Sequence, residues 1–303
     1  MPRSDASSEK LRDRLALRLV DTLMLLPFGA RVAVAGGLGS LIGRITGIGR
    51  KVERAVRHFR PDLPDAEVRL IARAVPGNLA RMTIEILSPA DLAPRAAELP
   101  LEGPGAAQLE ALKSDGRPAI LVSAHFGNYD AWRLGLIGRG YRIGGYFKEL
   151  GSAALNRRYV EAVSASGQPM FPDTNEGLRA LVRFLRSGGM LGILMDLDRP
   201  HGVLLDFLGQ PTRTVLSMAQ MSLRYEAPLV PIYAIRTRGA PGFRLWVDTP
   251  IAPDTPEAMT QALNDSFAAQ VRAHPEQWVW WHNRRKKSHP VPAATLASDT
   301  TRH

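Results

Sequence analysis

Three short apolar segments, separated by stretches of helical character, constrain the fold of this chain more than any other feature. They lie at residues 119–123, 190–195 and 228–235. Stretches typical of helices lie between them, at residues 176–187 and 212–225. Strands that alternate with helices predict βαβ units, in which parallel strands are joined by crossover helices. We therefore expect an α/β fold with a central sheet, mainly parallel or mixed, flanked by helices.

The chain is long enough to bury one large core, and its length alone allows one or two domains. It has 303 residues, of which 45% are hydrophobic and 22% charged. The sequence has no apparent internal repeat, and no linker divides its middle part. We expect amphipathic helices in residues 1–48 and one catalytic domain over residues 49–287. Residues 288–303 are rich in Pro, Ala, Ser and Thr without periodicity, which predicts a disordered tail.

A histidine and a carboxylate follow the first apolar segment. His125 is followed five positions later by Asp130, and residues 131–137 are typical of the start of a helix. His125 is therefore expected in a strand-to-helix loop. Such loops lie outside the carboxyl ends of the strands, where ligands bind in α/β folds. Asn128 or Asp130 could cap the incoming helix while facing this crevice.

This pair has the chemistry of a general base with an orienting acid. If Asp130 accepts a hydrogen bond from Nδ1–H of His125, the Nε2 lone pair can take a proton from a substrate hydroxyl that attacks an acyl carbon. The chain contains no cysteine, which excludes a thiol nucleophile. Ser123 is close in sequence, but no Gly-x-Ser-x-Gly elbow occurs. The alternative is a capping carboxylate beside a partly buried loop histidine.

The His-x4-Asp spacing at the end of an apolar strand resembles the motif of the glycerolipid and lysophospholipid acyltransferases. The fuller string His-Phe-Gly-Asn-Tyr-Asp at 125–130 resembles the branch of the bacterial lipid A late (lauroyl and myristoyl) acyltransferases and the mycobacterial phosphatidylinositol mannoside acyltransferases. Further segments follow in that family's order, and the resemblance covers about residues 10–287: Phe147-Lys148 with Asn156-Arg157-Arg158, then 192–199, 202–211, 227–231 and the Pro-Glu-Gln-Trp-Val-Trp-Trp-His-Asn-Arg string at 275–284.

Two departures from the family's pattern leave the acceptor open. The family often has two aromatic residues where this chain has Phe207-Leu208. It often has an acid-glutamine pair where this chain has Asp196-Leu197.

Four charged residues are candidates for binding or positioning roles. The resemblance implies that Arg157 or Arg158 binds the phosphate of a lipid acceptor or of a phosphopantetheine arm, with Arg157 ahead by its position in the segment. The alternative for both is a solvated surface position. Asp196 and Asp198 follow the buried strand at 190–195, and either is a candidate to position an arginine or to assist His125. We rank Asp196 first, and the alternative is a cap or turn carboxylate.

Several aromatic and glycine residues have a structural alternative. Phe207 and Gly209 are candidates to shape a loop beside the acyl chain, although a simple turn explains them equally well. Trp278, Trp280 and Trp281 could line an acyl groove, but aromatic residues this close together more often complete a core. His282 has no carboxylate at a similar spacing, so we expect a structural role.

Residues 1–48 have the pattern of amphipathic helices that could contact a membrane. Leucines recur at helical spacing, with arginines between them, from Leu11 to Leu23. Pro27 breaks this pattern, and the apolar stretch that follows, 32–43, is shorter than the roughly 20 residues that a spanning helix needs. One interpretation is that these two stretches form helices that lie in the membrane interface, and the other is that they are ordinary packing helices.

The net charge of the chain and its missing motifs limit the classes of partner that we expect. The chain has 39 Lys and Arg against 29 Asp and Glu, a net charge of +10. This excess suits an anionic membrane surface, an acidic acyl carrier protein or phosphorylated substrates. Nucleic acid is the weaker alternative, because no zinc spacing, RNA-binding aromatic signature or phosphate loop is present. The N-terminus lacks a secretory signal, and the resemblance implies a peripheral enzyme on the cytoplasmic face of the bacterial inner membrane.

The leading hypothesis is an O-acyltransferase that moves a fatty acyl chain from acyl carrier protein or acyl-CoA to a hydroxyl of a lipid or glycolipid. This reaction needs no metal and no redox cofactor. A backbone N–H near Gly127 is a candidate oxyanion donor. The alternatives are a lipid hydrolase or thioesterase that uses the same pair to activate water, and a non-catalytic membrane-binding protein.

Overall fold

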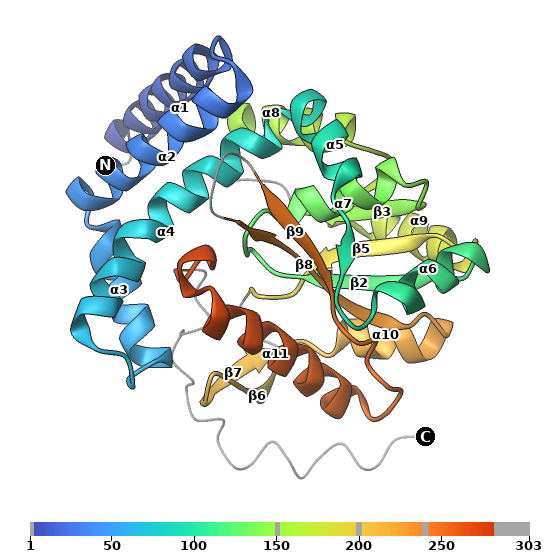
Figure 1. The fold of residues 1–303 in the computed structure, drawn as a ribbon. Helices are drawn as coiled ribbons and strands as arrows, with labels where there is room; N and C mark the ends of the chain where they lie inside the picture. Colours follow the sequence, from blue (N-terminus) through green and yellow to red (C-terminus); the bar gives the residue numbers. More distant parts are fainter. Residues whose placement is uncertain (1–2, 149–151, 198–201, 238–241, 282–303) are drawn as a thin grey trace.

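The computed structural model describes residues 3–148, 152–197, 202–237 and 242–281. Asp198, His282 and the predicted tail at 288–303 lie outside these described residues. Figure 1 shows a central sheet with helices on both sides, and helices α1 to α4 gathered at one end of it.

Seven strands in the described part of the chain form one sheet, in the order β1-β9-β8-β2-β5-β3-β4. Every neighbouring pair is parallel except β8 and β9, which are antiparallel. The predicted α/β fold with a mainly parallel or mixed sheet is confirmed. The strands of this sheet are β1 (Leu101–Glu102), β2 (Ala119–Ser123), β3 (Ile143–Phe147), β4 (Met170–Pro172), β5 (Met190–Leu194), β8 (Leu229–Arg236) and β9 (Phe243–Val247).

The helices account for most of the remaining described residues. They are α1 (Arg3–Met24), α2 (Phe28–Ile45), α3 (Ile48–Phe59), α4 (Asp65–Ile86), α5 (Pro89–Glu98), α6 (Ala106–Ser114), α7 (Tyr129–Gly138), α8 (Ala153–Ala165), α9 (Asn175–Arg186), α10 (Ser217–Tyr225), α11 (Pro256–Ala273) and the 3₁₀ turn Pro275–Gln277. The strands predicted at the three apolar segments are confirmed as β2, β5 and β8, and the helix predicted at 176–187 is α9.

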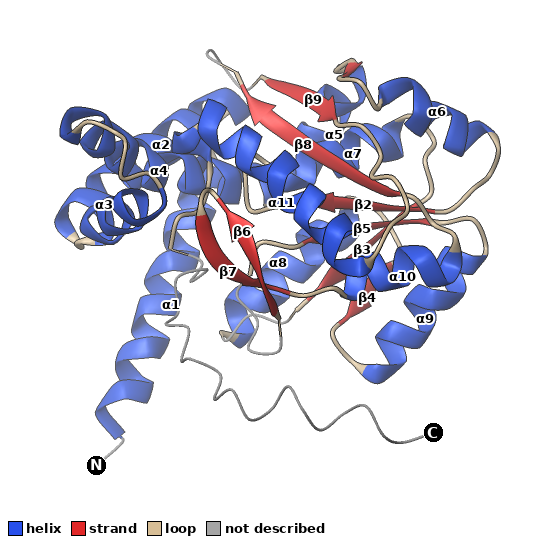
Figure 2. Cartoon of the chain, turned by 90° about the horizontal axis from the view of Figure 1, so that it is seen from below, coloured by secondary structure: helices blue, strands red, loops and turns tan. Residues whose placement is uncertain are grey.

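Strand β2 lies at the centre of the molecule and is buried on both faces. Ala119 and Leu121 pack into a core that includes residues of α5, α6 and α7. Ile120 and Val122 point the other way, into a core built with α9, α10 and α11. Helices cover both faces of the sheet when it is viewed from below (Figure 2). Burial on both faces explains why β2 is a continuous apolar run rather than an alternating one.

The helices after β2 and β5 lie on opposite faces of the sheet. The chain leaves β2 through α7 on one face, and it leaves β5 toward α10 on the other. Neighbouring parallel strands whose connections diverge in this way open a crevice beyond their carboxyl ends. The connections diverge after Ser123 and Leu194, the last residues of β2 and β5.

The prediction of a helix over residues 212–225 is partly wrong. Its second part is α10, but residues 212–214 belong to β7 (Gln210–Thr214), which pairs with β6 (Val203–Phe207) in an antiparallel hairpin. The side chains of Thr212 and Thr214 are buried, and β-branched residues suit a strand. The two turn residues, Leu208 and Gly209, have φ of 55° and 79°. Two positive φ values in a two-residue loop define a type I′ turn.

Helices α2 and α4 pack closely through small residues. A Cβ added to Gly39 would lie 2.5 Å from the Cβ of Ala80 and 2.7 Å from the carbonyl oxygen of Pro76. One added to Gly43 would lie 2.5 Å from the ring of Pro76. The backbones of α2 and α4 therefore approach each other more closely than larger residues would allow.

No single helix among the described residues has both the length and the apolar character of a membrane span. Helices α2 and α3 meet the criterion only when taken together, and they are bent by 83° with respect to each other.

We expect Gly39→Ala to lower the melting temperature of the intact chain by several degrees. The added methyl group must push α2 away from α4, and overpacking of this kind costs about 1–3 kcal/mol. Gly37→Ala is the matched control, because its Cβ would meet nothing within 4 Å. That change should be neutral or stabilising, since alanine favours a helix by up to about 1 kcal/mol over glycine. Thermal unfolding followed by circular dichroism measures both, and equal effects would contradict the close packing.

Candidate functional site

His125 and Asp196 meet beyond the carboxyl ends of β2 and β5. In the parallel register of these strands, Ser123 is the partner of Leu194. His125 and Asp196 each lie two residues further along, so the same register brings them side by side. The amide of Met195 also donates to the carbonyl of Ser123 at 3.0 Å, which extends the pairing past the end of the strands.

Among the described residues, the carboxylate of Asp196 contacts the ring of His125, the backbone N–H of His125 and the indole N–H of Trp278. Its Oδ1 lies 2.8 Å from Nδ1 of His125. Its Oδ2 accepts from the backbone N–H of His125 at 3.1 Å and from the indole N–H of Trp278 at 3.0 Å. Asp196 is completely buried, whereas 19% of the His125 side chain is exposed. A buried charge needs such partners, and they hold it in a single orientation.

This arrangement determines which nitrogen of His125 can act as a base. An ionised carboxylate only accepts hydrogen bonds, so Nδ1 of His125 carries the proton and donates it to Asp196. The lone pair of the neutral ring is then on Nε2. A histidine oriented in this way can accept a proton at Nε2, and the carboxylate stabilises the imidazolium that results.

The hydrogen bond predicted between His125 and Asp130 is not the one in the structure. Asp130 lies in the first turn of α7, and its Oδ1 accepts from Nε of Arg133 at 2.7 Å. Both side chains are almost fully buried. The physical reason is helix geometry, because residues i and i+3 lie on one face of a helix and Asp130 is directed toward Arg133. Asp196, which the sequence also named as a candidate to assist His125, takes the position predicted for Asp130.

Asp130 and Arg133 instead join α7 to the end of α8. Arg133 donates through its Nη2 to the carbonyl of Val163 at 2.8 Å and through Nη1 to the carbonyl of Gly167 at 3.3 Å. The second oxygen of Asp130, Oδ2, has no hydrogen-bond partner within the described chain.

Asn128 caps α7 and connects the histidine loop to a buried ion pair. Its Oδ1 accepts from the amides of Asp130 and Ala131, at 3.0 and 3.1 Å, as a helix N-cap does. Its Nδ2 donates to Glu85 of α4 at 2.9 Å. Glu85 is completely buried and accepts two hydrogen bonds from Arg236 at the end of β8, at 2.7 and 2.6 Å. One buried carboxylate thus joins α4, β8 and the histidine loop.

The Pro-Glu-Gln-Trp segment holds the histidine loop from the other side. The amide of Gly127 donates to the carbonyl of Gln277 at 3.0 Å, and the amide of Val279 donates to the carbonyl of His125 at 3.2 Å. Phe126 and Trp278 form an antiparallel bridge between these contacts. The side-chain amide of Gln277 bonds to both backbone groups of Arg236. This segment therefore has an architectural role, and Trp278 also contacts Asp196 directly.

Gly127 is required by this close approach. Its φ is +57°, and a Cβ at this position would lie 1.9 Å from the carbonyl oxygen of Ala234. The backbone N–H of Gly127, proposed from the sequence as an oxyanion donor, already donates to Gln277. It is therefore a structural donor in this conformation.

One tyrosine packs against the ring of His125, and a second tyrosine contacts the first. The ring of Tyr129 packs edge-on against His125, with centroids 5.4 Å apart. Its hydroxyl lies 3.3 Å from the hydroxyl of Tyr159 on α8. Burial is the main cause that raises the pKa of both phenols, that of Tyr129 well above its usual value. Both side chains are therefore neutral, and their hydroxyls can donate hydrogen bonds. The sequence analysis assigned no role to either.

The remaining predicted residues lie in several places. Arg157 is exposed on α8. Arg158 forms an ion pair with Asp21, which joins α8 to α1. Phe207 is buried against Phe267 and Trp278 in an aromatic core, and Gly209 forms the tip of the β6–β7 turn. No group of three or more histidine, aspartate or glutamate side chains in the described ranges is placed to hold a metal ion.

Comparison with known proteins places the chain in a family. Residues 5–287 match the sequence model of the bacterial lipid A biosynthesis acyltransferases. The chain belongs to this family. The branch indicated by the string at 125–130 is thereby confirmed, and the match includes the loop of His125, the end of β5 and the Pro-Glu-Gln-Trp segment.

Two curated relatives are each named phosphatidylinositol mannoside acyltransferase. The protein from Mycobacterium tuberculosis (strain CDC 1551 / Oshkosh) is 26% identical over 178 residues, which cover 57% of this chain and 56% of the relative. The protein from Mycolicibacterium smegmatis is 27% identical over 167 residues, which cover 54% and 55%. The chain thus spans about half the length of the curated relatives it matches.

We expect Asp196→Asn to lower the turnover number for acyl transfer by about 10²–10⁴-fold, because an amide can donate to Nδ1 and favour the wrong tautomer of His125. Asp130→Asn is the comparison. It should change turnover by less than about tenfold, and its effect should be on thermal stability through the weakened contact with Arg133. Initial rates and melting curves on both variants measure this. A larger loss of turnover in Asp130→Asn would reverse the assignment of the two carboxylates.

We also expect Glu85→Ala to destabilise the chain by about 3–5 kcal/mol, because it leaves Arg236 buried without its partner. The double variant Glu85→Ala with Arg236→Met removes both charges and should recover much of that loss. Urea unfolding measures the free energy of each variant. If the double variant were as unstable as the sum of the two single variants, the ion pair would not be the reason.

Proposed function

We propose that this protein is a membrane-associated O-acyltransferase that transfers a fatty acyl chain from a thioester to a hydroxyl of a lipid or glycolipid. The observation that carries the proposal is the hydrogen bond between Nδ1 of His125 and the buried Asp196. Membership of the lipid A biosynthesis acyltransferase family supports the reaction type. Relatives named for acyl transfer to phosphatidylinositol mannoside support a glycolipid acceptor.

The reaction proceeds by direct attack of the acceptor on the donor. Nε2 of His125 takes the proton from the acceptor hydroxyl as its oxygen attacks the thioester carbonyl carbon. Asp196 stabilises the imidazolium through Nδ1. The carbon–sulfur bond then breaks, the thiolate receives the proton from the imidazolium, and the new ester remains on the acceptor. The step needs no metal and no redox cofactor.

Membrane association is supported by the surface of the N-terminal helices. Most of the exposed large apolar side chains in the described chain belong to α1, α2 and their junction: Leu15, Leu19, Leu25, Leu26, Val34, Leu41, Ile42 and Ile45. Arg14, Arg18 and Arg44 are exposed on the same two helices. Apolar side chains with cations beside them are typical of helices that lie in the interface of an anionic membrane. We place the protein on the cytoplasmic face of the bacterial inner membrane.

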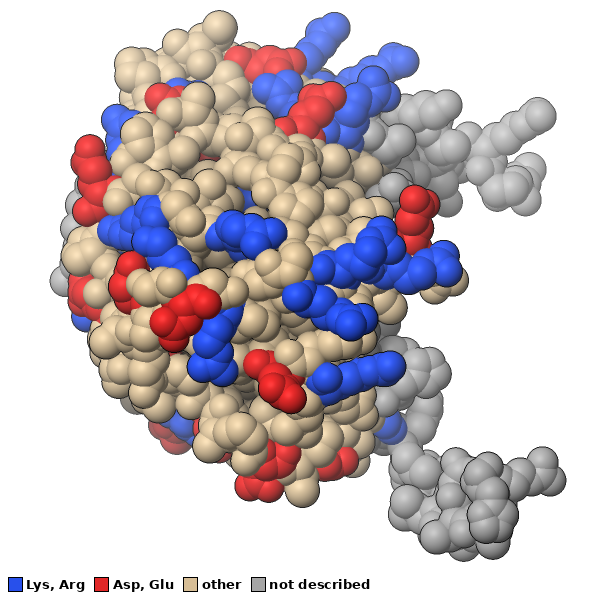
Figure 3. All heavy atoms as spheres, turned by 90° about the vertical axis from the view of Figure 1, so that its right-hand side faces the viewer, with Lys and Arg blue, Asp and Glu red and all other residues tan. Residues whose placement is uncertain are grey.

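An acidic carrier protein or coenzyme A is the proposed donor. On the face seen in Figure 3, basic side chains are interspersed with acidic ones. Arg179, Arg183 and Arg186 are exposed along α9. Cations of this kind favour the approach of a negatively charged donor.

The experiment is acyl transfer from labelled acyl carrier protein and acyl-CoA into a bacterial lipid extract, with intact wild type and His125→Ala. We expect a labelled lipid from wild type and a loss of rate of at least about 10²-fold in the variant. His274→Ala, on the C-cap of α11, is the control for removal of a histidine. Free fatty acid as the sole product would favour the hydrolase, and full activity in His125→Ala would reject the mechanism.

A further inference from the structure

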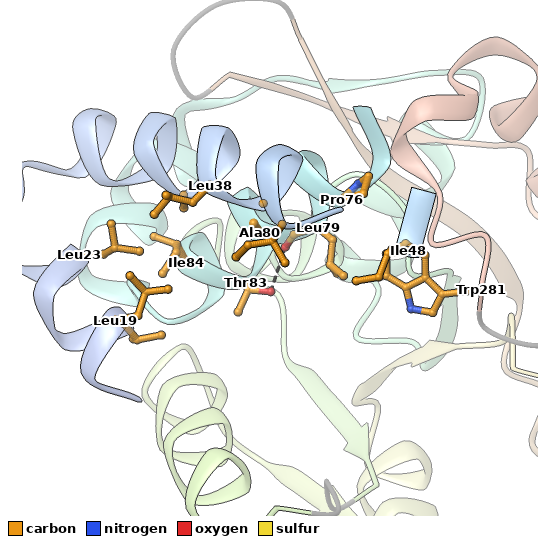
Figure 4. A pocket seen from close by; sticks show the side chains of 14 residues that line it. Leu19, Leu23, Leu38, Ile48, Pro76, Leu79, Ala80, Thr83, Ile84 and Trp281 are labelled. Carbon is orange, nitrogen blue, oxygen red and sulfur yellow. Dashed lines mark hydrogen bonds between the residues drawn. The ribbon is translucent and has the colours of Figure 1, made fainter. Parts of the chain in front are cut away.

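An apolar cavity of about 290 Å³ lies between α1, α2 and α4. Figure 4 shows its elongated form, with Leu19 and Leu23 of α1 at one end and Ile48 and Trp281 at the other. Leu38 of α2 and the α4 residues Leu79, Ala80, Thr83 and Ile84 lie between these ends.

The wall of this cavity suits a hydrocarbon chain. Its one hydroxyl, on Thr83, already donates to the carbonyl of Leu79 at 2.9 Å. A polar ligand would find few hydrogen-bond partners there, whereas an alkyl chain would lose contact with water at no such cost. An apolar cavity of about 150 Å³ accommodates one benzene molecule, so this one has room for a segment of roughly ten carbons.

The cavity opens on the apolar surface of the N-terminal helices. Leu19 and Ile42 line it and are also exposed, at 41% and 40%. They belong to the same exposed apolar surface of α1 and α2 that supports membrane association. A lipid chain can therefore pass from the membrane into the cavity without crossing water.

The inner side of the cavity is connected to the site. Leu79 lines the cavity and also packs against the buried cluster of Met82, Ile86 and Val163, against which Tyr129 and Tyr159 pack as well. Tyr129 contacts the ring of His125. Trp281, at the far end, directly follows the segment that pairs with the histidine loop. The wall of the cavity is thus joined to His125 through packed side chains on one side and through the Pro-Glu-Gln-Trp segment on the other.

We propose that the cavity binds one hydrocarbon chain of the acceptor lipid and so holds the acceptor hydroxyl at His125. The proposal rests on the proposed function, because it names a subsite for the acceptor of that reaction. The position of the mouth selects the acceptor over the donor. The acceptor is already in the membrane on which α1 and α2 lie, whereas the donor chain arrives from the aqueous side with its carrier.

The test is photolabelling of the intact chain with two probes. One is a lysophosphatidylglycerol with a diazirine on its acyl chain, in anionic vesicles, and the other is a non-hydrolysable acyl-CoA analogue with the same diazirine. We expect the lipid probe to label peptides of α2 and α4 around Leu38 and Leu79. Thr83→Trp should lower this labelling at least tenfold, because Thr83 is exposed and its replacement fills the cavity without changing the core.

Thr83→Ser, which keeps the hydroxyl, is the matched control and should label as wild type does. Leu178→Trp on α9 controls for an added surface tryptophan, and circular dichroism verifies the fold of each variant. Labelling of the same peptides by the acyl-CoA probe, blocked by Thr83→Trp, would overturn the proposal in favour of the donor chain. If the lipid probe does not label these peptides, the proposal is also overturned.

Labelling does not require turnover, so the two proposals fail separately. His125→Ala should still be labelled by the lipid probe at the wild-type level. Labelling in a chain that shows no acyl transfer would reject the proposed reaction and leave the lipid subsite in place.

Discussion

The contact between His125 and Asp196 is the interaction on which the rest of the site depends. A carboxylate with no exposure to water is stable only when its oxygens are paired, and Asp196 obtains its partners from the ring and backbone of His125 and from the indole of Trp278. The ends of β2 and β5 and the segment after α11 must therefore all be in place at once. The geometry of the base is a consequence of folding rather than of local sequence.

Glu85 is a second buried carboxylate that holds the histidine loop in place. Glu85 receives hydrogen bonds from Arg236 and Asn128, and Asn128 in turn caps α7. Gln277 bonds to the backbone of Arg236 and accepts from Gly127. Because these contacts share residues, a change at one of them affects the position of His125 through the others. Catalytic groups that the folded protein already holds in position lower the entropic cost of orienting the reacting atoms.

The N-terminal helices join the site to an apolar surface. Glu85 of α4 accepts a hydrogen bond from Asn128 in the histidine loop. Helix α4 also packs closely against the glycines of α2, and α1 and α2 carry exposed leucines. The apolar cavity lies between these helices. One helix thus supports the histidine loop on one side and lines the apolar cavity on the other. Under the proposed function, this helix links the membrane surface to the reaction.

The sequence by itself determined the order of strands and helices and the position of His125 after a buried strand, because apolar periodicity and helix signals are local properties. It also determined the family, through motifs spread over the chain. It offered both Asp130 and Asp196 as residues that could assist His125, and it put Asp130 first. Asp130 is near in sequence, but helix geometry directs it to Arg133. Asp196 lies 71 residues away and is brought beside His125 by the register of β2 and β5. Only the tertiary structure decided this, since strand pairing is a non-local interaction that local spacing does not encode.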